Sequence, residues 1–287
     1  MDFRLSEDQR DLRRGVRDLL DGRFGRAALR AAVDGGGGLD RGLWKELGEA
    51  GLFALRLPEA EGGVGLGLPE AVLVFEETGR ALVPGPLVAT HMAAGAVEGA
   101  AEGRTVVTEV SPEGLVPWLD AADVVRGDAT GAVPVRSVDP LTPLHRVPGT
   151  GDPAPEAVLL TAAEQVGTAA WCTAAAVAYA GQREQFGQVI GGFQAVKHLC
   201  AGMLVRTELA RAAVHAAAVT ADPVEIAGAK LLADEAAVAN ARDCLQVHGG
   251  MGFTWEADVH LHLKRAWVRA ALVLPGDRAA EEVAAAL

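Results

Sequence analysis

The sequence predicts a mainly α-helical protein in three parts: an N-terminal helical domain, a reduced middle β segment and a C-terminal four-helix bundle. Apolar residues recur at helical spacing over about the first hundred residues and again after residue 156. Between these regions, eight of the 14 prolines fall in the stretch from Pro112 to Pro155, and proline disfavours helix interiors and central strands alike. We therefore divide the chain into residues 1–102, 103–155 and 156–287.

Helix start and stop signals organise the N-terminal part. Ser6 can cap a first helix that carries an apolar stripe. A short helix around Leu47 is expected to end at Gly51, because glycine is favoured just after helix ends. Pro69 suits the first turn of a further helix, which we expect to run toward Gly79. These signals predict a domain of packed helices.

The middle segment carries β-branched runs at residues 105–110 and 133–135. Such residues favour strands, so short strands and turns are expected here. A segment of about 50 residues lies near the lower limit for an independent hydrophobic core. We therefore interpret it as a small β-rich insert or linker.

Two apolar faces at helical spacing identify long helices in the C-terminal part. One face consists of Val196, Leu199, Met203, Ala210 and Val214. Another consists of Leu231, Val238 and Leu245, after which Gly249 and Gly250 stop the helix. Long amphipathic helices with short connections predict an antiparallel four-helix bundle.

Composition excludes several functional classes. Hydrophobic residues make up 50% of the chain, which is enough for a sizeable core. The net charge of −12 comes without a basic run, which argues against nucleic-acid binding. No stretch approaches the roughly 20 apolar residues of a membrane span. The charged N-terminus has no apolar region typical of a signal peptide.

The cysteines and histidines predict neither a disulfide framework nor a metal site. Cys172, Cys200 and Cys244 are widely spaced and odd in number, so we expect a cytoplasmic protein. His260 and His262 stand two residues apart, which places them on different faces of a helix. The excess of arginine over lysine, with abundant alanine and glycine, fits a GC-rich bacterial genome.

The first motif that can carry chemistry runs from Tyr179 to Gln194. Here Arg183 precedes a Phe186–Gly187 break, which places a permanent cation and an aromatic ring at the end of a helix. A guanidinium can donate paired hydrogen bonds to a pyrophosphate, which lysine cannot reproduce. On this fragment alone, a surface arginine paired with Glu184 is the favoured interpretation.

The second motif runs from Gln246 to Glu256 and contains the pair Gly249–Gly250. Glycines after a helix let the backbone come into contact with a ligand, and a glutamine side chain can bind an adenine or ribose edge. Taken alone, the glycines are equally consistent with a simple helix stop.

In this order, on a helical bundle that follows a β-rich segment, the two motifs resemble the acyl-CoA dehydrogenase family. The N-terminal third resembles the family's opening helices at Glu7–Gln9, Leu43–Leu47, Gly51–Leu52, Leu57–Glu59, Gly62–Gly63 and Glu76–Pro84. The resemblance covers about residues 1–100 and 156–270. It implies the acyl-CoA dehydrogenase fold, FAD as cofactor, oxidation of an acyl-CoA between Cα and Cβ, and electron transfer to an electron-transfer flavoprotein-like acceptor.

The resemblance also implies which residues contact FAD. The positions that match family contacts to the pyrophosphate and adenosine are Arg183, Gln185, Phe186 and Gln194. The positions that match the adenosine-side loop are Gln246, Val247, His248, Gly249 and Gly250. In the family, these contacts reach across a dimer interface to the flavin of the neighbouring subunit.

Two departures from the family concern what a subunit provides for its own flavin. Thr108–Pro112 begins like the family's Thr-Glu-Pro loop, but the remaining β segment is short and lacks the Trp-x-Thr strand. The literal Trp171–Thr173 lies in a predicted helix instead. The family's Glu-Gly pair, which carries the catalytic base, matches the apolar stretch Ala270–Gly276. Glu156, near the position where some members place the base, is the remaining candidate, with Glu164 two turns further on.

The motifs that act on a neighbour's flavin are thus present, and those that act on the chain's own flavin are missing. This pattern resembles family members that form mixed αβ assemblies in bacterial sterol side-chain breakdown. We expect a subunit of an α2β2 acyl-CoA dehydrogenase whose full-length partner supplies the base. The alternatives are a homo-oligomeric dehydrogenase that uses Glu156 and a flavin-free scaffold that binds partners or CoA thioesters.

Overall fold

The computed structural model describes residues 4–149 and 151–286 and is mainly α-helical, as predicted. The N-terminal helices are α1 (Glu7–Arg23), α2 (Arg26–Asp34), α3 (Arg41–Glu49), α4 (Leu68–Ala81) and α5 (Leu87–Ala93), with a short 3-10 helix η1 (Glu59–Glu61). The C-terminal helices are α6 (Pro155–Gln182), α7 (Gln194–Thr220), α8 (Pro223–His248), α9 (Val259–Leu272) and α10 (Gly276–Ala285), with 3-10 turns η3 (Ile190–Gly192) and η4 (Gly249–Phe253).

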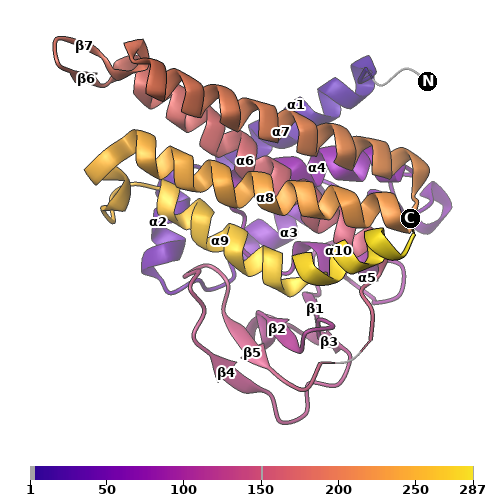
Figure 1. Ribbon diagram of the computed structural model, residues 1–287. Helices are drawn as coiled ribbons and strands as arrows, with labels where there is room; N and C mark the ends of the chain where they lie inside the picture. Colours follow the sequence, from indigo (N-terminus) through magenta and orange to yellow (C-terminus); the bar gives the residue numbers. More distant parts are fainter. Residues whose placement is uncertain (1–3, 150, 287) are drawn as a thin grey trace.

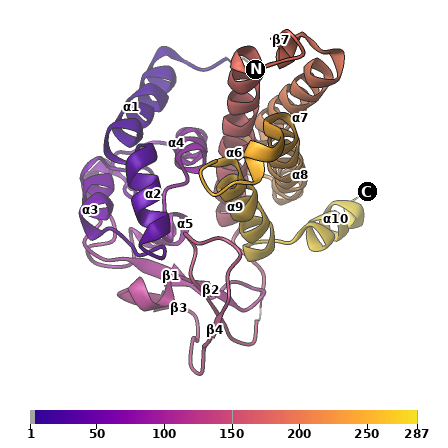
Figure 2. The ribbon, with the colours of Figure 1, turned by 90° about the vertical axis from the view of Figure 1, so that its left-hand side faces the viewer.

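Three long helices, α6, α7 and α8, lie side by side and form most of the C-terminal bundle (Figure 1). Short connections make α7 antiparallel to both neighbours, so α6 and α8 run in the same direction. The shorter α9 packs against α6 and α8. The view in Figure 2 places α1, α2 and α3 on one side, the bundle on the other and the strands of the middle segment below them. Among the described residues, no helix is long and apolar enough to cross a membrane.

The N-terminal domain joins the bundle where α4 crosses α6. A Cβ atom on Gly79 would lie 2.0 Å from the carbonyl oxygen of Glu164, and one on Gly167 would lie 1.9 Å from that of Glu76. Both positions therefore require glycine for close backbone contact. The sequence interpretation had the helix run toward Gly79, whereas α4 continues to Ala81 and Gly79 lies inside it, at the contact with α6.

A buried charge cluster reinforces this junction. The Glu76 carboxylate on α4 accepts hydrogen bonds from Arg13 of α1 at 2.9 Å and from Arg211 of α7 at 2.9 and 3.0 Å. His215 of α7 lies 3.6 Å from the same carboxylate. Neighbouring Glu77 pairs with Arg13 as well. Because charges buried from water must be compensated, this cluster ties α1, α4 and α7 together.

The middle segment contains strands of three residues each. They are β1 (Val107–Glu109), β2 (Leu115–Pro117), β3 (Val124–Arg126), β4 (Val133–Val135) and β5 (Leu144–Arg146), with the 3-10 turn η2 (Leu119–Ala121) between β2 and β3. Strands β1 and β3 pair in parallel, and β5 lies between β2 and β4 in an antiparallel sheet. Buried Val107 packs with Ala93 and Ala100 of the N-terminal domain. The segment therefore shares its core with neighbouring helices.

Candidate functional site

The two sequence motifs meet at one end of the bundle. Helices α6 and α8 end there and α7 begins there, because the three helices alternate in direction (Figure 1). Tyr179, one turn before Arg183, stacks on His248 with ring centroids 4.2 Å apart. The structure thus brings the segment around Arg183 next to the loop that follows α8.

The first motif forms a β-hairpin that projects from the bundle (Figure 1). Its strands are β6 (Glu184–Gln185) and β7 (Gln188–Val189), joined by Phe186 and Gly187. Both turn residues have positive φ, 55° and 80°, which is the geometry of a type I′ turn. Phe186 is 90% exposed and makes an edge-to-face contact with Phe193 at 6.1 Å. A bulky residue with positive φ is unusual, and this conformation costs stability.

Arg183 lies at the base of this hairpin and caps α6. Its backbone N–H donates to Tyr179, and its carbonyl accepts from Ile190, both at 2.8 Å. Across the described ranges 4–149 and 151–286, the guanidinium has neither a hydrogen-bond acceptor nor an ion-pair partner. The surface pair with Glu184 considered from the sequence does not form. Arg183 is therefore an exposed cation with its donors available.

The two glutamines predicted to contact the cofactor, Gln185 and Gln194, lie in different structural elements. Gln185 donates a hydrogen bond from Nε2 to the carbonyl of Glu184 at 2.8 Å. Gln194 is the first residue of α7 and is exposed. The N-terminus of a helix carries unpaired N–H groups and a partial positive charge. The start of α7 therefore adds to the positive character of this end of the bundle.

The second motif presents backbone to solvent after α8. Val247 is buried, whereas Gln246 and Gly250 are exposed. Gly249 has φ 60° and ψ −140°, a conformation that is costly for any residue with a Cβ atom. A Cβ built on Gly249 or on Gly250 would meet nothing within 4 Å. The glycine pair thus leaves an open surface that a ligand can approach.

His248 anchors the start of this loop. Its Nδ1 lies 2.8 Å from the carbonyl of Cys244 and 3.7 Å from the Cys244 thiol. The hydrogen bond with the Cys244 side chain raises the pKa of His248, against the lowering effect of burial. The ring is held on its other side by the stack with Tyr179. An unpaired arginine, a helix N-terminus and exposed glycine backbone together form a site suited to phosphate and nucleoside groups.

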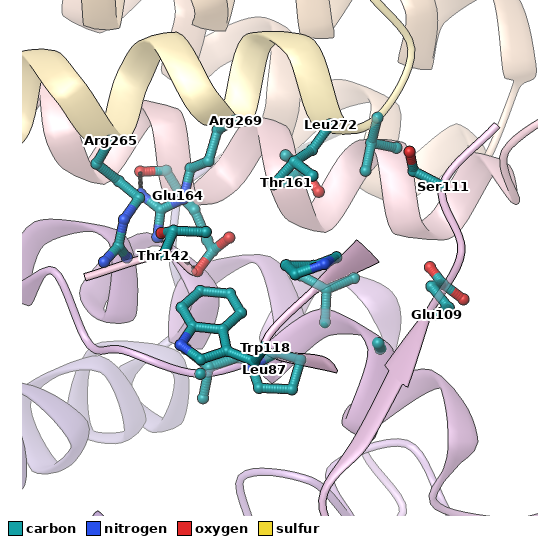
Figure 3. Close-up of a pocket in the computed structure, with 16 residues that line it drawn as sticks. Leu87, Glu109, Ser111, Trp118, Thr142, Thr161, Glu164, Arg265, Arg269 and Leu272 are labelled. Atoms are coloured by element: carbon teal, nitrogen blue, oxygen red, sulfur yellow. Dashed lines mark hydrogen bonds and ion pairs between the residues drawn. The ribbon is translucent and has the colours of Figure 1, made fainter. Parts of the chain in front are cut away.

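A second concave feature lies between the helices and the β segment, as Figure 3 shows. It is an inner cavity of about 80 Å³. Its lining includes Leu87 and Val88 of α5, Trp118, Glu164 of α6, Arg265, Arg269 and Leu272 of α9, and Val273 directly after α9. Pockets that hold ligands of drug size have volumes of roughly 300–1,000 Å³. This cavity is therefore too small for a tricyclic flavin ring.

Buried ion pairs fill the wall of the inner cavity. Arg269 pairs with Glu164 at 2.7 Å, and Arg265 pairs with Asp139 of the β segment. Burial lowers the pKa of Arg269 to about 10, while the charge of Glu164 raises it. Arg265 also lies 5.9 Å from the ring of Trp118. These pairs were not found from the sequence, because their partners lie more than 100 positions apart along the chain.

The carboxylates predicted as possible bases are engaged in ion pairs. Glu156 accepts two hydrogen bonds from Arg56, at 2.6 and 2.9 Å, and does not line the inner cavity. The bond to Arg56 lowers the pKa of Glu156, which weakens it as a base. Glu164 lines the cavity but is held by Arg269. Where the family base was expected, the cavity wall is apolar at Leu272 and Val273.

The remaining sequence predictions concern aromatic and histidine residues of the bundle. Trp171 lies within α6, as expected, and stacks on His262 at 3.8 Å. His260 stacks on Trp255 at 4.9 Å. The part of the chain that the structure describes contains no group of three or more His, Cys, Asp or Glu side chains that could hold a metal ion.

Comparison with known proteins identifies the family. The model of the acyl-CoA dehydrogenase N-terminal domain matches residues 6–102, and that of the acyl-CoA dehydrogenase C-terminal domain matches residues 157–275. The acyl-CoA dehydrogenase IpdE2 of Mycobacterium tuberculosis is 39% identical over 289 aligned residues, which cover 91% of each protein. The chain belongs to the acyl-CoA dehydrogenase family. The resemblance inferred from the two motifs is therefore confirmed.

Solved structures of the family share this fold. A chain of the ChsE4-ChsE5 complex from Mycobacterium tuberculosis has a TM-score of 0.85, 23% identity, and coverage of 99% of this chain and 98% of that chain. A chain of the Tcur3481-Tcur3483 steroid ACAD G363A variant has a TM-score of 0.82, 24% identity, and coverage of 97% of both. FAD is the cofactor of the family. Its phosphate and nucleoside groups fit the outer end of the bundle, whereas its ring does not fit the inner cavity.

Proposed function

We propose that this chain completes the FAD site of a different, catalytic acyl-CoA dehydrogenase subunit. The observation that carries the proposal is the contrast between two places in one chain. The outer end of the bundle offers the unpaired Arg183 and the glycine backbone of Gly249 and Gly250, where an added Cβ would meet nothing within 4 Å. The inner cavity is narrowed by ion pairs and has apolar Leu272 and Val273 where a base is needed. The outer site thus supports flavin binding in an assembly, and the inner one does not support catalysis by this chain alone.

In this assembly each side chain has a defined task. Arg183 would donate paired hydrogen bonds to the pyrophosphate. The backbone of Gly249 and Gly250 would lie against the adenosine, and the exposed ring of Phe186 would pack on it. When bound, FAD supplies the acceptor for the hydride that leaves Cβ of the acyl group. The partner would supply the base that removes the α-proton, and the electrons would pass to an electron-transfer flavoprotein-like acceptor.

Exposed apolar side chains support an assembly of unlike subunits in an α2β2 arrangement. On α7, the outward-facing Leu204, Val205 and Leu209 are 52%, 57% and 59% exposed. Val205 and Leu209 lie four residues apart and so share one helical face, with Leu204 beside it, and contiguous exposed apolar surface marks protein interfaces. The similarity to a chain of the ChsE4-ChsE5 complex further supports a partner of the same fold.

The catalytic partner, and not this chain, would determine which class of substrate the assembly accepts. The acyl pocket would lie in the catalytic subunit, since the inner cavity here is too small for it. The similarity to the Tcur3481-Tcur3483 steroid ACAD supports a steroid-derived acyl-CoA as the substrate of the assembly. The ion pair of Glu156 with Arg56 disfavours the alternative of a homo-oligomer that uses Glu156 as its base.

The flavin content of the purified protein tests this proposal. The chain expressed alone should be colourless and should not oxidise acyl-CoA substrates. Expressed together with a full-length family member from the same genome that carries the base, it should yield a yellow complex. A yellow, active preparation of the chain alone would contradict the proposal.

Replacing Phe186 with asparagine should make the chain more stable and should weaken FAD binding by the complex. Asparagine tolerates positive φ better than phenylalanine, so the free energy of unfolding should rise by about 1 kcal/mol. The same change removes the exposed ring and should weaken FAD binding by the complex about tenfold, as expected for the loss of one aromatic stack. Urea denaturation of the chain and a fluorescence titration of the complex with FAD measure the two effects. Unchanged FAD affinity would exclude the ring from the site.

A further inference from the structure

The loop that carries the glycine pair is held at its far end by helix α2 of the N-terminal domain. Arg26 donates from Nε to the Asp258 carboxylate at 2.6 Å and from Nη2 to the carbonyl of Glu256 at 2.7 Å. Arg30 donates from Nε to the other oxygen of Asp258 at 2.7 Å and from Nη1 to the carbonyl of Trp255 at 2.5 Å. Two arginines one turn apart thus hold a carboxylate and two consecutive backbone carbonyls of one short segment.

This arrangement differs from an ordinary surface ion pair. The Asp258 side chain is only 12% exposed and Arg30 is 16% exposed, whereas Arg26 is 65% exposed. Exposed pairs contribute little because water competes with them, whereas bonds from a charged donor to a partly buried acceptor are stronger. Each guanidinium also contacts side chain and backbone together, which fixes the direction of the loop as well as its distance from α2.

Between its two ends, the loop has a small number of contacts of its own. At its start, His248 bonds to Cys244, and Gly252 packs against the carbonyl of Leu245 so closely that a Cβ there would lie 2.9 Å from it. Beyond this point, Phe253 and Trp255 are 76% and 52% exposed, and the Trp255 ring stacks on His260 of α9. Arg26 and Arg30 of α2 then hold the backbone carbonyls of Glu256 and Trp255.

We propose that Arg26 and Arg30 are positioning residues that hold residues 249–258 in the shape that binds FAD. The inference rests on the proposed function, since it concerns the same loop. Neither arginine need touch the cofactor. They restrict the loop before binding, so that less conformational freedom is lost when the cofactor binds. The N-terminal domain, in which no residue was predicted to contact the cofactor, thereby contributes to the affinity for FAD.

The variants Arg30→Ala and Arg26→Ala/Arg30→Ala test the role of the two arginines. In the chain alone, amide hydrogen exchange of residues 249–257 should become about tenfold faster, because loss of bonds from a charged donor is worth about that factor. In the complex, the Kd for FAD should rise about tenfold. Arg30→Lys keeps the charge but cannot reach Asp258 and a carbonyl together, so it should restore only part of the affinity.

Arg41 provides a matched control for this experiment. It also joins an N-terminal helix to a loop, through Asp123 at 2.5 Å and the carbonyl of Ala121 at 2.5 Å, and that loop lies in the middle segment. The Arg41–Asp123 pair is more exposed, at 48% and 42%, so Arg41→Ala should lower the unfolding midpoint no more than Arg30→Ala does, and it should leave exchange in residues 249–257 and FAD affinity unaltered. Equal loss of FAD affinity in both variants would assign the effect to general stability and overturn the proposal.

The two readouts separate this inference from the proposed function. If the wild-type complex binds no FAD, the proposed function fails, and the cofactor role of the arginines fails with it. Hydrogen exchange would still show whether α2 orders the loop. If the complex binds FAD but exchange and affinity stay unchanged in Arg26→Ala/Arg30→Ala, the proposed function stands and the positioning role is overturned.

Discussion

Replacing Arg183 with alanine should raise the Kd of the assembled complex for FAD about 100-fold. The guanidinium has no partner among the described residues, so binding to a pyrophosphate would not require breaking an existing ion pair. Hydrogen bonds to charged groups contribute about 1.5–3 kcal/mol, and about 2.7 kcal/mol corresponds to a factor of 100. A titration of the apo complex with FAD, followed by flavin fluorescence, measures the change.

The stability of the chain should not respond to this substitution. Arg183 is exposed, so its removal should change the free energy of unfolding by no more than about 0.5 kcal/mol. Arg183→Lys should recover part of the affinity, because lysine keeps the charge without the paired donors. Arg14→Ala, which removes an arginine that is 68% exposed on α1, serves as the control and should leave FAD binding unchanged. An unaltered Kd in Arg183→Ala would remove this residue from the cofactor site.

Replacing Glu76 with glutamine should lower the free energy of unfolding by about 3–5 kcal/mol. The Glu76 side chain is 2% exposed and compensates the charges of Arg13 and Arg211 at the junction of α1, α4 and α7. Removing one partner of a buried ion pair leaves the other charges uncompensated, which costs about this amount. Glu208→Gln is a matched control because Glu208 also pairs with Arg211 but is 56% exposed. It should cost less than about 1 kcal/mol.

The pH dependence of stability should identify the same carboxylate. Burial raises the pKa of Glu76, but contact with His215 and the charges of Arg211 and Arg13 outweigh this and lower the pKa to about 2. The folded pKa lies below the ordinary value of 4.5. Glu76 therefore stabilises the fold above about pH 4.5, and this contribution is lost as the pH falls toward about 2. Urea denaturation across this range should show a steeper loss for the wild type than for Glu76→Gln. Equal slopes would contradict the assignment.

The helical architecture was predictable because periodicity and caps are local signals. Ser6 caps α1 as expected, and the N-terminal and C-terminal helices lie in the regions that the apolar spacing indicated. The role of Gly79 was not predictable, since a glycine inside a helix is read locally as a stop, whereas its close contact with Glu164 depends on how two helices cross. The strands of the middle segment were predicted by type, but not their pairing, which joins residues far apart in sequence.

The candidate site also has a part that was predictable from local sequence and a part that was not. The motifs around Arg183 and Gly249 were found from the sequence because their residues are consecutive, and the structure places both at one end of the bundle. Whether they bind FAD stays a prediction until the titrations are made. The ion pairs of the inner cavity and the contacts of Arg30 with Asp258 join residues more than 100 positions apart. Only the folded chain could reveal them.

The number of FAD molecules per pair of subunits tests the central claim most directly. Absorbance of the flavin released from the purified complex, divided by the concentration of αβ pairs, gives this ratio. We predict a ratio of about one, since the inner cavity of this chain is too small for a flavin ring and its outer end completes the site of the partner. A ratio of two per pair would mean that this chain holds a flavin of its own, and would contradict the account.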